Sequence, residues 1–175
     1  LVVGLVERGT DGAPNLALTV ALEGGDVTRL ALEAPVSRIE AIGQDALIVT
    51  QAGGTRFVTV SLTGEAPEIA DRFLLENSAE SESRSHAFFF RPDGVDGDGL
   101  AALPLLAGGS RDANMVYLQR EAGQFSWLGR LDARARPGLD DGCQASCADW
   151  YGNARPIFLR DRILTLLGYE IIEGR

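Results

Sequence analysis

The most specific chemical pattern in the sequence is an aspartate- and glycine-rich loop at residues 93–99. Asp93, Asp96 and Asp98 alternate there with glycine and valine. Carboxylate oxygens that a tight glycine turn brings together are typical Ca²⁺ ligands. The loop departs from the calcium-binding pattern, because Gly94 takes its first position and Leu105 stands where a closing glutamate is needed. The sequence therefore favours a solvated hairpin turn and leaves a calcium site on the three aspartates as the alternative.

The two cysteines, Cys143 and Cys147, are close together in the sequence. If the segment forms one helical turn, their Cα atoms lie roughly 6 Å apart, within reach of a disulfide. A metal site would need further ligands, and the single histidine lies far away along the chain. The spacing predicts a disulfide in an oxidising compartment, with a metal site or two inert thiols as alternatives.

His86 is the one side chain that could serve as an imidazole base. Nucleophilic catalysis would also need an activated serine, and the sequence has no G-x-S-x-G elbow. We therefore expect His86 to be hydrogen-bonded between strands. Amphipathic aromatic side chains concentrate at interfaces, which makes Trp150 and Tyr151 candidate interaction residues. Trp127 and Tyr117 are further aromatic candidates, although single aromatics more often lie in a core.

The composition excludes several function classes. The chain has 25 acidic residues and 16 basic ones, all arginine, so its net charge is −9. Such a chain is repelled by nucleic acid and by anionic membranes. Without lysine it has no Schiff-base or Walker-type lysine, and without a long uncharged apolar run it has no membrane span. An apolar content of 45% predicts a folded domain with a core.

Short β-type runs separated by Gly, Pro, Asp and Asn follow one another along the chain, roughly one every twelve residues, which is typical of sandwiches, barrels and propellers. One segment is ambiguous, because residues 68–75 fit a helical face as well as a strand. The acidic, serine-rich segment 76–83 is expected to be a solvated loop. The predicted strands are 2–7, 15–22, 27–33, 37–42, 46–51, 55–62, 68–75, 86–91, 99–106, 114–120, 124–131, 155–160, 163–168 and 169–173.

A weak internal repeat relates residues 38–49 to residues 155–166. Each has an arginine, an apolar run, a polar turn and a second apolar run. A period of roughly 45–50 residues with four strands a unit is that of propeller blades. The fold class expected is all-β: part of a β-propeller, with about three to four four-stranded antiparallel blades. The expected divisions are the end of a blade (1–35), two blades (36–83 and 84–133), a disulfide-bearing loop insertion (134–152) and the start of a blade (153–175).

From residue 36 to residue 175 the order and spacing of these segments resemble those of a known family. The segments that carry the likeness are residues 84–90, 99–105, 115–118, 125–131 and 154–166. The chain resembles bacterial secreted proteins with a C-terminal β-propeller domain, which are distant relatives of WD40 repeats. It departs from their pattern at Arg160 and Asp161, where the family has a Gly-Asp turn, and in the insertion that holds the cysteines.

The resemblance implies export from the cell, and it implies no established reaction and no catalytic residues. The chain begins at Leu1 with an apolar β-type run, which indicates a piece of a longer protein whose targeting segment would lie outside it. We expect a non-catalytic scaffold or binding domain that is secreted, periplasmic or on the cell surface. Its rim loops would recognise a protein or a carbohydrate ligand. The alternatives are an extracellular hydrolase with carboxylates at the propeller axis and a calcium-stabilised structural module.

Overall fold

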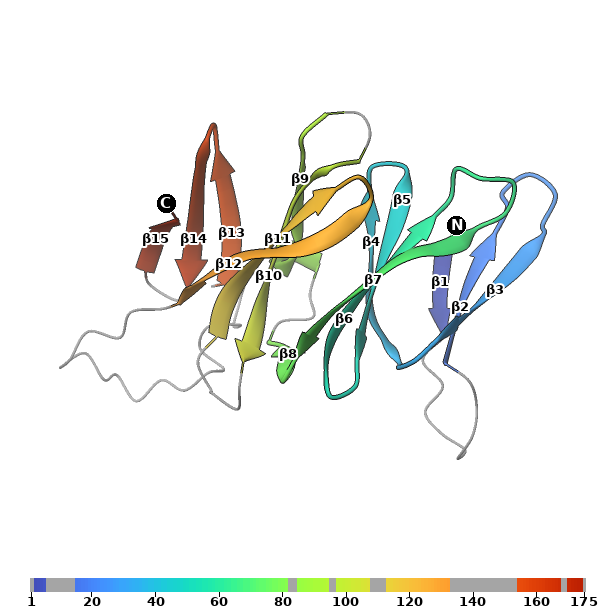
Figure 1. Cartoon of the computed structure of the whole chain (residues 1–175), viewed down its shortest axis with the longest axis horizontal. Coiled ribbons are helices and arrows are strands. Elements are labelled where there is room, and N and C mark those ends of the chain that lie inside the picture. Colours follow the sequence, from blue (N-terminus) through green and yellow to red (C-terminus); the bar gives the residue numbers. More distant parts are fainter. Residues whose placement is uncertain are drawn as a thin grey trace. The chain divides into compact units, whose positions relative to one another are not determined.

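The computed structural model describes residues 2–5, 15–81, 85–94, 97–107, 113–132, 154–167 and 170–174, with backbone alone for residues 2–5, 107 and 113. Within these residues the chain is all-β, with a single 3₁₀ turn, η1 (Ser85–Ala87) (Figure 1). The strands are β1 (Val2–Leu5), β2 (Asn15–Val20), β3 (Val27–Leu32), β4 (Val36–Ile42), β5 (Asp45–Gln51), β6 (Gly54–Ser61), β7 (Glu68–Glu76), β8 (Ser78–Glu80), β9 (Phe89–Pro92), β10 (Gly99–Ala107), β11 (Ala113–Glu121), β12 (Gln124–Asp132), β13 (Ala154–Leu159), β14 (Arg162–Leu167) and β15 (Glu170–Gly174).

The described strands form four sheets. Three of them are meanders, in which each strand pairs with the next one along the chain: β1-β2-β3, β4-β5-β6-β7 and β13-β14-β15. The fourth sheet has the order β12-β11-β10-β8, and β9 also pairs with β10. The pairs with a recorded register are antiparallel. Where the connection is described, as between β4 and β5, β5 and β6 or β11 and β12, a short turn joins the two antiparallel strands.

The chain divides into two compact units. The first comprises Leu1–Glu76 with the segments Pro92–Asp98 and Arg120–Phe125. The second comprises Asn77–Arg91, Gly99–Gln119 and Ser126–Arg175. The first unit thus contains the sheets β1–β3 and β4–β7, and the second contains β13–β15 and most of the β8–β12 sheet.

In the first unit the core lies between two sheets. Ala17, Leu30 and Leu32 from β2 and β3 pack against Ile48 and Val58 from β5 and β6. The sheet β1–β3, blue in Figure 1, accordingly lies beside the sheet β4–β7. Burial of the larger side chains stabilises the pair of sheets by about 1.5–3 kcal/mol for each fully buried leucine, isoleucine or valine.

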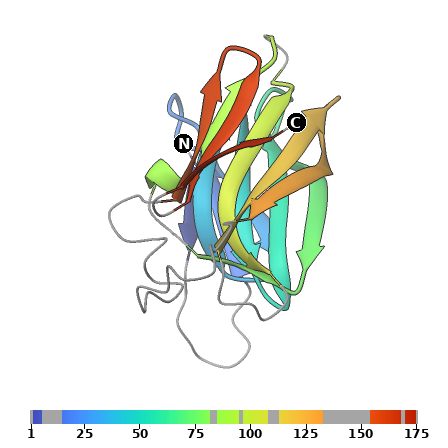
Figure 2. The same cartoon turned by 90° about the vertical axis from the view of Figure 1, so that its left-hand side faces the viewer.

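The second unit repeats this arrangement with other side chains. Met115 and Tyr117 from β11 share a buried cluster with Ala154 from β13 and Leu167 from β14. Figure 2 shows the red strands β13–β15 beside the yellow and orange strands of the β8–β12 sheet. The rings of Tyr117 and Phe158 meet edge to face, with centroids 6.3 Å apart. In each unit, therefore, two sheets bury apolar side chains against each other.

A buried hydroxyl group ties the two sheets of the second unit together. The Tyr117 side chain is 3% exposed, and its hydroxyl group hydrogen-bonds to the Thr165 hydroxyl group and donates to the Leu164 carbonyl oxygen at 3.3 Å. Burial disfavours the charged phenolate and raises the pKa of Tyr117 from 10.0 to about 12, although the bond to Thr165 opposes the shift. The folded chain therefore holds the Tyr117 proton more tightly than the unfolded chain does.

This difference predicts a loss of stability at high pH. Between about pH 10 and pH 12 the unfolded chain releases the Tyr117 proton and the folded chain keeps it, so the free energy of unfolding falls by up to about 1.4 kcal/mol per pH unit. Tyr117→Phe is expected to start about 1 kcal/mol less stable at pH 8, because it loses the hydrogen bond, and to lack this slope. Urea unfolding of both proteins from pH 8 to pH 11.5 measures the effect, and parallel curves above pH 10 would contradict it.

The structure settles the ambiguous segments and corrects two of the predictions. Residues 68–76 form strand β7, whose side chains alternate strictly between exposed and half-buried. The segment predicted as a solvated loop (76–83) instead contains β8, in which Ser78 is buried and which pairs with the end of β10. The predicted strand 86–91 is η1 followed by β9. The cysteine-bearing insertion lies outside the described residues.

Candidate functional site

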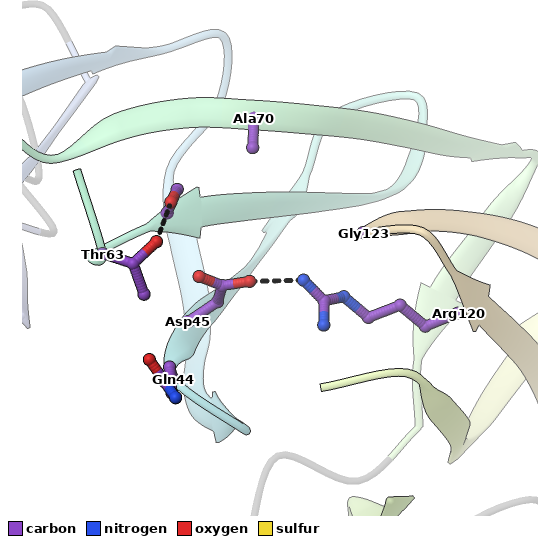
Figure 3. Close-up of a pocket in the computed structure, with 7 residues that line it drawn as sticks. Gln44, Asp45, Thr63, Ala70, Arg120 and Gly123 are labelled. Atoms are coloured by element: carbon purple, nitrogen blue, oxygen red, sulfur yellow. Dashed lines mark hydrogen bonds and ion pairs between the residues drawn. The ribbon is translucent and has the colours of Figure 1, made fainter. Parts of the chain in front are cut away.

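A polar pocket of about 430 Å³ lies in the first unit, at the end of the sheet β4–β7 where its hairpin turns gather (Figure 3). The lining residues come from the β4–β5 turn and the start of β5, the end of β6, the β6–β7 connection, the bulge in β7, and the end of β11 with the turn that follows it. We call this cavity the turn pocket. It is lined by Gln44, Asp45, Ser61, Thr63, Ala70, Arg120 and Gly123.

Tight turns give the turn pocket its walls. The β4–β5 connection has two residues, Gly43 and Gln44, and Gly43 has a positive φ of 63°. The β11–β12 connection is Ala122 and Gly123, with φ of 49° and 80°. Two-residue hairpins need positive φ at one or both central positions, because only then does the turn match the twist of the strands. The sequence places a glycine at one position of each turn, Gly43 and Gly123, and these glycines allow the positive φ that each turn needs.

The buried side chain of Arg120, at the end of β11, binds both the loop at Gly97 and the start of β5. Its guanidinium group donates through Nη1 to the carbonyl oxygen of Gly97 and through Nη2 to Oδ2 of Asp45. The Arg120 side chain is 2% exposed, and that of Asp45 is 18% exposed. A buried charge is tolerated only when it is paired and hydrogen-bonded. The Arg120–Asp45 pair therefore fixes the β4–β5 turn, the loop at Gly97 and the end of β11 relative to one another.

Two further carboxylates tie the same turns. Asp98 Oδ1 accepts a hydrogen bond from the Gly123 amide at 3.4 Å, and Asp71 Oδ2 accepts one from the Phe125 amide at 3.0 Å. The loop before Asp98 closes on itself, because the Asp93 amide donates to the Asp98 carbonyl oxygen at 2.8 Å. Asp98 thus has a structural partner already.

The calcium site proposed on the aspartate loop stays a prediction. Asp93 is exposed and Asp98 is half-buried beside Gly123, whereas Asp96 lies outside the described residues. Among the described residues, histidine, cysteine and carboxylate side chains form no group of three or more that could hold a metal ion.

Gly43 in the β4–β5 turn packs closely against Gly97, which allows a matched test of this contact. A Cβ atom on Gly43 would lie 2.8 Å from the Gly97 Cα, whereas one on Gly53, at φ of 67°, would meet nothing within 4 Å. Both alanine variants carry the left-handed strain of about 1–2 kcal/mol. Gly43→Ala is expected to lower the free energy of unfolding by about 1–3 kcal/mol more than Gly53→Ala, because it alone forces two backbones apart. Equal losses of the free energy of unfolding in urea would show that Gly43 does not pack against Gly97.

The remaining lining offers hydrogen bonds without net charge. The Ser61 and Thr63 hydroxyl groups lie 3.3 Å apart, and the Gln44 side chain is exposed. Asp45 Oδ1 has no hydrogen-bond partner in the part of the chain that the structure describes. Since Arg120 neutralises Asp45, the pocket suits a polar ligand that needs no counter-charge.

The other residues singled out in the sequence lie elsewhere or are not described. His86 lies in η1, Tyr117 is buried as a core residue, and Trp127 on β12 is 46% exposed. The predicted disulfide pair Cys143 and Cys147 and the candidate interaction residues Trp150 and Tyr151 lie outside the described residues, so these remain predictions.

Nothing in the sequence alone singles out Arg120 or Asp45. Arg120 is the only charged residue in the run 113–120, but Glu121 follows it at the same strand end, so its position in the sequence does not mark it as a buried residue. The pairing of Arg120 with Asp45 across 75 positions of sequence could be found only once the strands were placed.

Comparison with models of known protein families, with characterised proteins and with solved structures finds no match for this chain. Within the described part of the chain, no helix has the length and apolar character needed to cross a membrane.

Proposed function

We propose that this chain is part of a β-propeller that serves as a non-catalytic binding or scaffold domain outside the cytoplasm, and that it recognises its ligand at the turn pocket. The meander order of the sheets and the face-to-face packing of two sheets in each unit support the propeller, since blades are meanders that stack side by side. The resemblance to exported propeller proteins supports the location.

The observation that carries the binding role is the turn pocket itself. Its walls are hairpin turns, and a buried ion pair holds them in place. Turns on a rigid sheet scaffold are where binding residues concentrate. A preformed cavity needs little ordering when the ligand enters, which favours binding.

The lining of the turn pocket favours binding over hydrolysis at this site. Glycoside hydrolysis uses two carboxyl groups that face the substrate bond. The lining of the turn pocket has one carboxylate, Asp45, and that group is engaged with Arg120. Neither an acid and base pair nor an activated nucleophile is formed by the lining residues, so we propose binding without turnover.

A titration with small probes tests the binding role. The isotopically labelled protein is followed by amide NMR while a neutral probe (methyl α-glucoside), an anionic probe (acetate) and a cationic probe (methylguanidinium) are added. We expect at least one probe to give saturable shifts at Gln44, Asp45, Thr63 and Gly123, and to be recovered chemically unchanged. If no probe shifts these residues, or if a probe is consumed, the proposed function is wrong.

A further inference from the structure

We infer that the turn pocket takes an uncharged ligand with several neighbouring hydroxyl groups, that is, a saccharide unit. This inference rests on the proposed binding function and adds the chemical class of the ligand. The charge of the lining, its hydrogen-bonding groups and the size of the cavity support it.

The charge of the lining excludes strongly ionic ligands. Asp45 and Arg120 are the only charged residues among the lining residues that the structure describes, and they neutralise each other. An anion would meet the Asp45 carboxylate, and Arg120, at 2% exposure and with bonds to Gly97 and Asp45, is in no position to receive it. A cation would compete with Arg120 for Asp45. A neutral ligand avoids both costs.

The hydrogen-bonding groups suit hydroxyl groups, which both donate and accept. Asp45 Oδ1 accepts only, the Gln44 amide both donates and accepts, and the Ser61 and Thr63 hydroxyl groups do either. In Figure 3, Gln44, Asp45 and Thr63 lie next to one another along one side of the cavity. Neighbouring hydroxyl groups on one sugar ring can therefore bond to a carboxylate oxygen and an amide at the same time.

Size and apolar contact agree with one sugar unit. The cavity of about 430 Å³ lies within the range of small-molecule sites. The Ala70 methyl group and the Gly123 backbone add a small apolar face for the C–H groups of a ring. With few apolar contacts and exposed hydrogen bonds, we expect a dissociation constant in the millimolar range.

The test compares sugars with a ring that lacks most hydroxyl groups. Methyl α-glucoside, methyl α-galactoside and methyl α-mannoside are each titrated into the labelled protein, beside tetrahydropyran-2-methanol, which has a similar ring and one hydroxyl group. We expect at least one glycoside to give saturable shifts at the lining residues and the single-hydroxyl ring to bind at least tenfold more weakly. The free sugars are titrated in parallel, since binding of the glycosides identifies the end of a glycan as a source, whereas binding of free sugars alone identifies a free monosaccharide.

Variants on exposed positions locate the contact without disturbing the ion pair. Gln44→Ala and Thr63→Ala are expected to weaken binding about three- to tenfold each, as for lost hydrogen bonds. The matched control is Gln124→Ala, an exposed glutamine on β12 that does not line the pocket, and it should bind as the unmodified protein does.

The outcomes separate this inference from the proposed function. If acetate or methylguanidinium binds in the turn pocket and no sugar does, the ligand class is wrong and the binding role stands. Equal affinity for the single-hydroxyl ring, or sugar-induced shifts away from the lining residues, also overturns the saccharide assignment. If none of the probes binds, both proposals fail.

Discussion

Replacing Arg120 with methionine is expected to lower the free energy of unfolding by about 3 kcal/mol. Removal of one partner from a buried ion pair costs about 3–5 kcal/mol, because the other charge is left without compensation. The lower end applies, since Asp45 keeps 18% exposure to water. Methionine matches the length of the apolar stem of arginine, so the loss reports the guanidinium group and its bonds to Asp45 and the Gly97 carbonyl oxygen.

The control for this variant is an arginine in an exposed ion pair. Arg162 Nε lies 2.7 Å from Glu173 Oε1, yet the Arg162 side chain is 57% exposed. Exposed pairs contribute little and are screened by salt, so Arg162→Met is expected to change urea unfolding hardly at all. If Arg120→Met were as mild as Arg162→Met, Arg120 would not be holding the turns.

Phe57→Ala is expected to lower the free energy of unfolding by about 4 kcal/mol, the cost of emptying a large buried site. Phe57 on β6 is fully buried. Its ring lies 6.1 Å from the Phe73 ring and 6.3 Å from the Phe125 ring, both tilted, so the truncation removes two aromatic contacts as well as apolar burial.

Two comparisons check the cause of that loss. Phe57→Leu keeps most of the volume and should cost less than about half as much. Phe89→Ala makes the same chemical change at a position that is 38% exposed, and its effect should be small. Equal losses from Phe57→Ala and Phe89→Ala would contradict the burial of Phe57 between its two aromatic neighbours.

Most strands could be predicted because β-type runs and turn residues are local signals. Gly43 and Gly53 mark hairpin turns by their own conformational freedom, and the strands on either side follow from them. The segment now called β7 stayed ambiguous, since its apolar residues fit both a helical and a strand period. Its pairing with the preceding strand, β6, decides between the two.

Two features of the sheets could not be predicted from local patterns. Strand β8 is polar and only three residues long, and it exists because the edge of β10 offers it hydrogen bonds. Strand β6 alternates threonine with apolar residues, which indicates one wet face, yet Thr55 and Thr59 are fully buried. Burial depends on what packs against a face, and the strand's own sequence does not contain that information.

The turn pocket was the least predictable part. A charged residue at the end of a strand ordinarily lies in water, so neither Arg120 nor Asp45 could be distinguished in the sequence from a solvated side chain. The pattern of the aspartate loop predicts a hairpin turn with a calcium site as the alternative, and it does not predict that Asp98 bonds to the Gly123 amide or that the Gly97 carbonyl oxygen accepts a bond from Arg120.

The Arg120–Asp45 pair builds the turn pocket, and a double-mutant cycle measures whether the two side chains depend on each other. Urea unfolding is measured for the unmodified protein, Arg120→Met, Asp45→Asn and the double variant. We predict a coupling free energy of about 2 kcal/mol, as for close charge pairs removed from water. A coupling below about 0.5 kcal/mol would mean that the two side chains act independently, and the pocket as described would not exist.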